Sequence, residues 1–210
     1  MRIALALMAI VVAPSATPDV KKLLLQPAQV GKGYVMLAAA GGSGVAGDRT
    51  MNLCGIDYPS ESLRVSRIQV NYLKQKAVIG ITNEVVTYKG AGAEQAMREA
   101  LQHATSCPTH PIDSGVKGLP KLTFRVKQVR DSRLLKGYLA VQIDVRGTVN
   151  GRPVAQTSYA VYQQRGKVLS GVYSFGTTPK GQLALCLHAA EQSARNLRRG
   201  GSGSSSAPTA

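Results

Sequence analysis

Acidic residues and histidines are scarce in this sequence of 210 residues, which holds 11 Asp and Glu and 3 His against 26 Lys and Arg. The carboxylates fall mostly on expected helix faces or in turns, so no pair stands out as the two-carboxylate site of a glycosidase. We assign none of His103, His110 and His188 to a ligand set with another His, Cys or carboxylate. We therefore expect no metal site.

Short motifs that could indicate catalysis or nucleotide binding are incomplete. Asp113-Ser114-Gly115 is similar to the aspartic protease signature, but the second copy that supplies the other carboxylate is missing, and such a tripeptide is a common turn. The glycine-rich segment 41–47 lacks the Gly-Lys-Ser/Thr ending of a phosphate-binding loop, so it predicts a flexible loop. No Gly-x-Ser-x-Gly elbow occurs. We expect no catalytic residues and no cofactor.

Only one long hydrophobic run occurs, over residues 3–13. It follows Arg2 and ends in the small residues around Ser15, which is the layout of a secretory signal peptide over residues 1–16. The run is shorter than the roughly 20 residues that span a bilayer, so we expect no integral membrane segment after cleavage. The alternative is a hydrophobic N-terminal strand, which the lack of alternating polar residues disfavours.

Three cysteines in an exported chain allow one disulfide and one remaining thiol. Cys54 precedes turn residues, and Cys107 ends an expected helix before a proline; at such positions the backbone can adapt to disulfide geometry. Cys186 lies inside an amphipathic helix on the face of Leu183 and Ala190, where a thiol packs as a small apolar group. We predict a Cys54–Cys107 disulfide and a buried, unpaired Cys186.

The formal net charge is +15, and such an excess attracts polyanions such as nucleic acid, anionic lipid or an anionic cell-wall polymer. The densest basic stretch, residues 117–136, has no interleaved aromatic residues, and no nucleic-acid-binding motif accompanies it. We therefore expect no nucleic-acid partner. The basic residues are interpreted as a solvated face suited to an anionic cell surface.

Alternating apolar and polar residues predict strands in two groups, separated by a helix over residues 93–106. A final helix is expected to begin at Thr178-Pro179, a hydroxyl N-cap followed by proline. Asn150-Gly151 indicates a tight hairpin, because both residues tolerate positive φ, and the second group therefore predicts an antiparallel meander. The predicted strands cover residues 64–73, 76–88, 121–129, 138–149, 153–164 and 167–175, with another beginning at Tyr34.

These elements predict a single α+β domain over residues 17–199. Two main helices should flank a twisted antiparallel sheet of about six or seven strands. Residues 200–210 contain no apolar residue larger than alanine, so they predict a disordered tail rich in glycine and serine.

Several features occur in a particular order along the chain. They are the entry segment 23–34, Leu53-Cys54-Gly55, the strand 85–88, the alanine-rich helix ending at Cys107-Pro108, the meander and the last helix. This order resembles the PknH-like extracellular sensor domains of actinobacteria, a family of receptor-kinase sensor domains and free-standing secreted or lipid-anchored relatives. The resemblance covers residues from about 20 to 198 and implies a helix-flanked antiparallel sheet with a cleft for an unidentified ligand and no catalytic residues. This sequence departs from the family in having no kinase domain, no transmembrane segment and one cysteine too few for two disulfides.

Three classes of function remain open. The first is a secreted, monomeric, non-catalytic sensor-like domain that binds a small-molecule or polymeric ligand of the cell envelope, through residues that the sequence does not identify. The second is a basic structural or adhesive protein that associates with anionic cell-wall polymer, with binding that weakens steeply as salt rises. The third is a hydrolase with an unrecognised site.

The signal peptide gives the first testable prediction. Protein recovered from culture supernatant should begin near Ala16 or Thr17, because the apolar run ends there in small residues. N-terminal sequencing checks this, and an intact Met1 on the secreted protein would contradict it.

Overall fold

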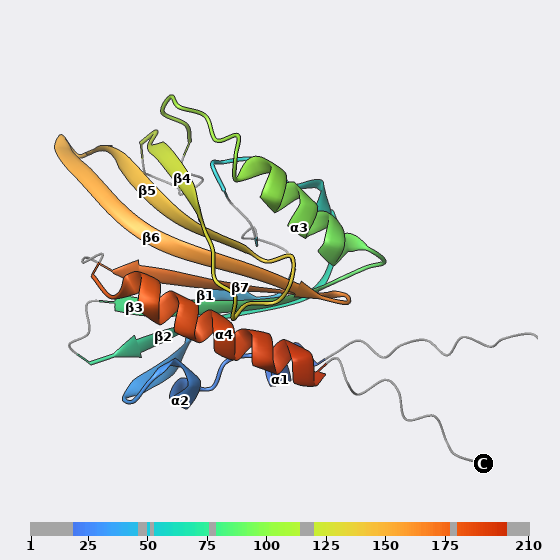
Figure 1. Ribbon diagram of the computed structural model, residues 1–210. Helices are drawn as coiled ribbons and strands as arrows, with labels where there is room; N and C mark the ends of the chain where they lie inside the picture. The colour runs from blue at the N-terminus through green and yellow to red at the C-terminus, as the bar shows by residue number, and fades with distance from the viewer. Residues whose placement is uncertain are drawn as a thin grey trace, which may run out of the picture.

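A seven-stranded antiparallel sheet runs through the middle of the molecule (Figure 1), with the strand order β1-β2-β3-β7-β6-β5-β4. The computed structural model describes residues 19–45, 50, 53–75, 79–113, 120–176 and 180–200. This confirms the predicted α+β domain with a single sheet. The strands are β1 (Tyr34–Ser43), β2 (Arg64–Lys74), β3 (Ile79–Tyr88), β4 (Thr123–Val129), β5 (Leu139–Val149), β6 (Arg152–Arg165) and β7 (Val168–Gly176).

Two long helices cover opposite faces of the sheet. Helix α3 (Gly92–His103) connects β3 to β4, so the chain crosses to the far edge of the sheet and returns as the meander β4-β5-β6-β7. Helix α4 (Gln182–Gly200) follows β7 and packs on the other face. The short elements α1 (Val20–Leu23), α2 (Pro27–Val30) and the 3₁₀ turn η1 (Pro59–Leu63) complete the described structure. No helix in the described ranges has both the length and the hydrophobicity needed to cross a bilayer.

The apolar stripe of α4 makes the larger core. Leu187, Ala190, Ala194 and Leu197 are buried against the sheet, as the spacing predicts, and Leu183 is half-buried at the rim. Each fully buried leucine stabilises the fold by roughly 1.5–3 kcal/mol. Cys186 lies in this core as a free, fully buried thiol, and burial raises its pKa to about 12.

Buried amides connect this core to the chain around it. The Asn83 side chain accepts a hydrogen bond from the Leu25 amide at 3.0 Å and donates to Ser170 at 3.1 Å. The Gln163 side chain accepts from the Leu135 amide at 2.9 Å and donates to the Ala190 carbonyl at 2.8 Å. Because both amides are satisfied, they position the α1 segment, the sheet and α4 relative to each other without an unpaired polar group.

The second core lies under α3, where the disulfide is also found. The alanine face of α3 packs on the even-numbered residues of β3 and on β5, β6 and β7. Cys54 and Cys107 are bonded, with their Cα atoms 5.5 Å apart, and this is the pairing that the sequence predicts. The bond fixes the end of the α3 segment to the chain that precedes η1.

Two local expectations need correction, one is confirmed, and others fall outside the described chain. The glycine-rich segment does not begin as a loop: β1 continues through Gly41 and Gly42 to Ser43, with an irregular register after Ala38. Gly200 belongs to α4, not to a tail. The Asn150-Gly151 hairpin is confirmed, with φ of 50° and 73°. The signal peptide 1–16, the helix start at Thr178-Pro179, Ser114-Gly115 and residues 201–210 lie outside the described residues.

Removing the disulfide should lower stability. The bonded residues are 53 positions apart, and closing a loop of that length stabilises a fold by about 4 kcal/mol on the chain-entropy model. We expect Cys107→Ser to lower the free energy of unfolding in urea by several kcal/mol. A reducing agent should lower the melting temperature of the wild type and leave that of Cys107→Ser unchanged. Equal stability of the oxidised and reduced wild type would contradict this.

Candidate functional site

Strands β6 and β7 pair over only half the length of β6. Their register runs from Tyr159–Ser174 to Arg165–Val168, whereas residues 152–158 of β6 pair with β5 alone. Figure 1 shows β5 and β6 rising away from β7 and β3 at this end. We call the region between residues 152–158 of β6 and the end of β7 the fork.

A short chain of buried hydrogen bonds closes the base of the fork. The Tyr159 amide donates to Ser174 Oγ at 3.0 Å, and these two residues are the last register pair of β6 with β7 among the described residues. Ser174 Oγ donates in turn to Gln182 Oε1 at 3.1 Å. Ser174 and Gln182 are buried. These bonds fix the point of divergence and connect it to the first residue of α4.

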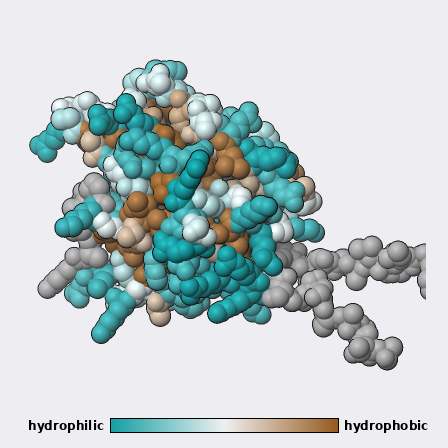
Figure 2. Space-filling view, in the orientation of Figure 1, coloured by the Kyte–Doolittle hydropathy of each residue, from teal (hydrophilic) through white to brown (hydrophobic). Residues whose placement is uncertain are grey.

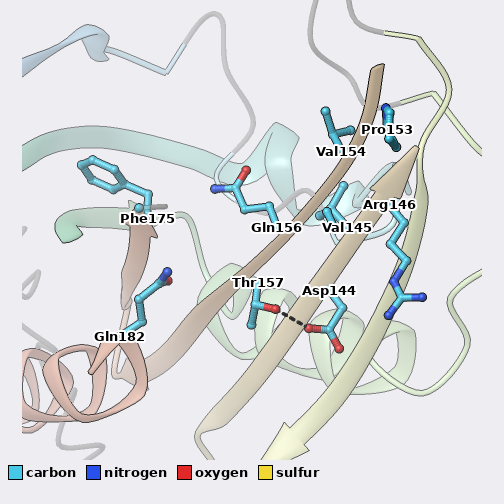
Figure 3. A pocket seen from close by; sticks show the side chains of 11 residues that line it. Asp144, Val145, Arg146, Pro153, Val154, Gln156, Thr157, Phe175 and Gln182 are labelled. Carbon is cyan, nitrogen blue, oxygen red and sulfur yellow. Dashed lines mark hydrogen bonds between the residues drawn. The ribbon is translucent and has the colours of Figure 1, made fainter. Parts of the chain in front are cut away.

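The fork encloses an open cleft of about 810 Å³, within the usual size range of ligand sites. Figure 3 shows Gln156 extending from β6 toward Phe175 on β7, with Gln182 below. Figure 2 shows hydrophobic side chains in the middle of this face of the molecule, with hydrophilic ones around them. The lining is residues 144–146 of β5, 153–157 of β6, 175–176 of β7 and Gln182 of α4.

One wall of the cleft carries a fixed carboxylate. Asp144 accepts hydrogen bonds from Thr157 Oγ1 at 2.7 Å and from Gln142 Nε2 at 2.9 Å, and Lys127 Nζ lies 3.9 Å away. Desolvation raises the pKa of Asp144, but these hydrogen bonds and the charges of Lys127 and Arg146 outweigh it, so the pKa lies below 3.8. The carboxylate is therefore ionised and already satisfied near neutral pH.

The opposite wall is apolar. Phe175 lies across Gly80, its register partner on β3, and any side chain at Gly80 would collide with the phenyl ring. A glycine at this strand position leaves backbone exposed, and the ring covers it. Leu73 of β2 also lies beside Gly80. The cleft thus has a polar, charged wall on β5 and β6 and an aromatic wall on β7.

A buried ion pair on the face of the sheet that α3 covers is a second candidate site. Arg67 donates to Glu84, and Tyr173 donates to the other Glu84 oxygen at 2.9 Å. Desolvation raises the pKa of Glu84, and Arg67 opposes that shift. Gly171 is the register partner of Glu84, and its missing side chain lets the Tyr173 ring lie across it. Every oxygen of Glu84 has a partner, so the cluster has the character of a structural network.

The histidines do not come together. His110 and His188 are exposed, and His103 is half-buried edge-on against the Tyr58 ring, with 5.4 Å between centroids. Among the described residues no three His, Cys, Asp or Glu side chains lie close enough to hold a metal ion.

The residues of the fork were not predicted from the sequence, since no motif surrounds Ser174 or Gln182. Only Asp144, an acidic residue inside a strand, could have drawn attention.

Comparison with known proteins gives a fold relationship. No protein-family model and no curated protein matches the sequence. The structure is similar to the crystal structure of the extracellular domain of PknH from Mycobacterium tuberculosis, with a TM-score of 0.54 and 10% sequence identity. The match covers 85% of this chain and 98% of that domain. The chain therefore has a fold similar to that of this extracellular domain, as the sequence resemblance implies.

The hydrogen bond from Thr157 should hold the Asp144 pKa down. Thr157→Val removes the hydroxyl and keeps the shape, so we expect the Asp144 pKa to rise toward its usual value, measured by carbon-13 NMR of the carboxyl group. Because the folded pKa is depressed, the stability that Asp144 contributes is present above about pH 4 and is lost as the pH falls through the folded pKa. An unchanged pKa in Thr157→Val would contradict this.

Proposed function

We propose that this protein is an exported, non-catalytic binding domain that holds an extracellular or cell-envelope ligand in the fork cleft. The observation that carries the proposal is the cleft itself, which is open, has one charged and one aromatic wall, and is fixed at its base by buried hydrogen bonds. Sites of this kind orient a ligand with a few polar groups and gain affinity from the apolar ones.

Two further observations support the export and the sensor-like character. The Cys54–Cys107 disulfide is a bond that persists in oxidising compartments outside the cytoplasm. The fold is similar to that of the extracellular domain of PknH.

The cleft chemistry supports binding without catalysis. Bonds from Thr157 and Gln142 hold the Asp144 carboxylate in place. Among the described residues that line the cleft, no second carboxylate, histidine or cysteine lies beside it to act as the partner acid or base.

A second candidate function is association with anionic cell-wall polymer. Arg125, Lys127 and Arg146 are exposed on β4 and β5, where Arg125 and Lys127 neighbour Asp144 and Gln142 in the register. A single carboxylate lies among these cations, so the face is net positive. Binding through this face would weaken steeply with salt, whereas binding in the cleft would depend on the ligand.

Filling the cleft tests the proposal. Gln156 is exposed and points toward Phe175 (Figure 3), so Gln156→Trp should occupy the cleft without disturbing the core. In a thermal-shift screen of envelope lipids, glycans and peptides, a ligand that raises the melting temperature of the wild type should fail to raise that of Gln156→Trp.

The matched control is Thr148→Trp, an exposed change on the same hairpin outside the cleft lining. It should respond to the ligand as the wild type does. Equal responses of all three proteins would contradict a site in the fork, and a response that disappears with salt in all three would favour the basic face.

A further inference from the structure

A row of exposed apolar side chains runs from the cleft across the sheet to β1, the strand at the end of the strand order. Val35 of β1 and Leu73 of β2 are register partners, so their side chains lie side by side on one face of the sheet. Val35 is 55% exposed and Leu73 is 37% exposed. Single exposed apolar residues are ordinary on a protein surface, but contiguous ones mark binding sites.

Phe175 joins these side chains to the cleft. A side chain at Gly80 would meet both the Phe175 ring and Leu73, so these two apolar groups lie close together over Gly80. Phe175 is also the register partner of Gly80 and lines the cleft. We call Val35, Leu73 and Phe175 the apolar row. It extends from β1 across β2 and β3 to β7, which is three strand spacings or about 14 Å.

The apolar row is narrow. Helix α3 covers the same face of the sheet near Val86 and Tyr88, about 20 Å or more further along β3. On the side toward α3, the next positions of β2 and β3 are the polar pair Asn71 and Thr82, which are bonded to each other at 2.7 Å. Leu37, the partner of Asn71 on β1, widens the row only at its end. A slender chain fits this strip better than a protein partner, which covers about 800 Å².

Charge is present at the cleft end of the row. Arg146 lines the cleft and is exposed, whereas the neighbouring Asp144 already accepts hydrogen bonds from Thr157 and Gln142. The side chains of the apolar row carry no charge. An anionic group is therefore favoured in the cleft, and an uncharged apolar group is favoured along the row.

From this arrangement we infer that the ligand of the fork cleft is an anionic amphiphile with one alkyl chain, whose head group lies near Arg146 and whose chain lies along the apolar row. The inference rests on the proposed function and names its ligand class. A fatty acid has this chemistry. Its chain would cover Phe175 first, then Leu73 and then Val35, and each methylene that leaves water adds to the affinity.

A series of saturated fatty acids from hexanoate to hexadecanoate tests the row. In titration calorimetry below the concentration at which the acids aggregate, affinity for the wild-type protein should rise about 2- to 4-fold with each methylene, for a chain that is half to fully buried. The gain should stop once the chain is longer than the row, because further methylenes stay in water. Affinity that does not depend on chain length, or that rises without an end point, would overturn the inference.

Polar substitutions of similar shape locate the chain. Leu73→Asn should weaken binding of the longest fatty acids about 10-fold and that of hexanoate least. Val35→Thr, at the far end of the row, should stop the gain at a shorter chain. The matched control is Leu101→Asn on α3, where Leu101 is 38% exposed, and it should bind as the wild type does. Equal binding by Leu73→Asn and Leu101→Asn would contradict the inference.

The head group is tested separately. Arg146→Gln should weaken every member of the series by the same factor, up to about 5-fold, because it removes an exposed ion pair. A fatty alcohol should bind the wild type more weakly than the acid of the same chain length and should not respond to Arg146→Gln. An alcohol that binds as tightly as the acid would overturn the inference.

The outcomes separate this inference from the proposed function. If no fatty acid binds, but another ligand stabilises the wild type and not Gln156→Trp, the inference is wrong and the proposed function stands. The inference is also wrong if the protein sediments with phosphatidylglycerol vesicles but binds no monomeric fatty acid. If Gln156→Trp binds every ligand as the wild type does, both fall.

Discussion

The hydrogen bond from the Tyr159 amide to Ser174 Oγ joins β6 to β7 at Tyr159–Ser174, the last register pair that the described parts of the two strands share. Gln182 holds Ser174 from the other side and ties the divergence to the start of α4. Because these groups are buried, breaking the chain would leave unsatisfied polar atoms, each costing about 1–3 kcal/mol. The cleft is therefore a property of the sheet and not of a loop.

The buried Arg67–Glu84 pair makes one arm of the fork rigid. Burying two charges costs several kcal/mol per ion unless the geometry and additional hydrogen bonds compensate. Here Arg67 also donates to the Gly41 carbonyl, and Glu84 also accepts from Tyr173, so β1, β2, β3 and β7 share one network. In the described part of the chain, the other arm, the outer half of the β5–β6 hairpin, holds no buried ion pair and is largely exposed. It is held by strand pairing with β4 and by the bonds from Thr157 and Gln142 to Asp144.

The parts of the fold that follow from periodicity could be predicted from the sequence. The alternation of apolar and polar residues predicted the positions of β2, β5, β6 and β7. The apolar stripe from Leu187 to Leu197 predicted which face of α4 packs on the core. The end of β1 was missed because Gly41 and Gly42 carry no pattern, although β1 pairs with β2 again at Ser43 after an irregular stretch that follows Ala38. The fork was missed for a related reason. Residues 153–164 were predicted as one strand, and their order of apolar and polar residues does not show how far along that strand β7 pairs with it.

The net charge and the fork act on different aspects of binding. A charge of +15 attracts any polyanion from a distance and accelerates encounter, but it falls off within about 8–10 Å at physiological salt and does not select among ligands. Selection requires contacts that fail for the wrong partner. In the fork, selective contacts act at short range. They come from the Phe175 ring, the uncharged residues 153–157 of β6 and the Asp144 carboxylate, which already accepts a hydrogen bond from Thr157. Since Arg146 lines the cleft and belongs to the basic face, the same residue can draw an anionic ligand toward the surface and hold it at the entrance. The positive charge then assists binding in the fork, and a separate polymer-binding function is not needed to explain it.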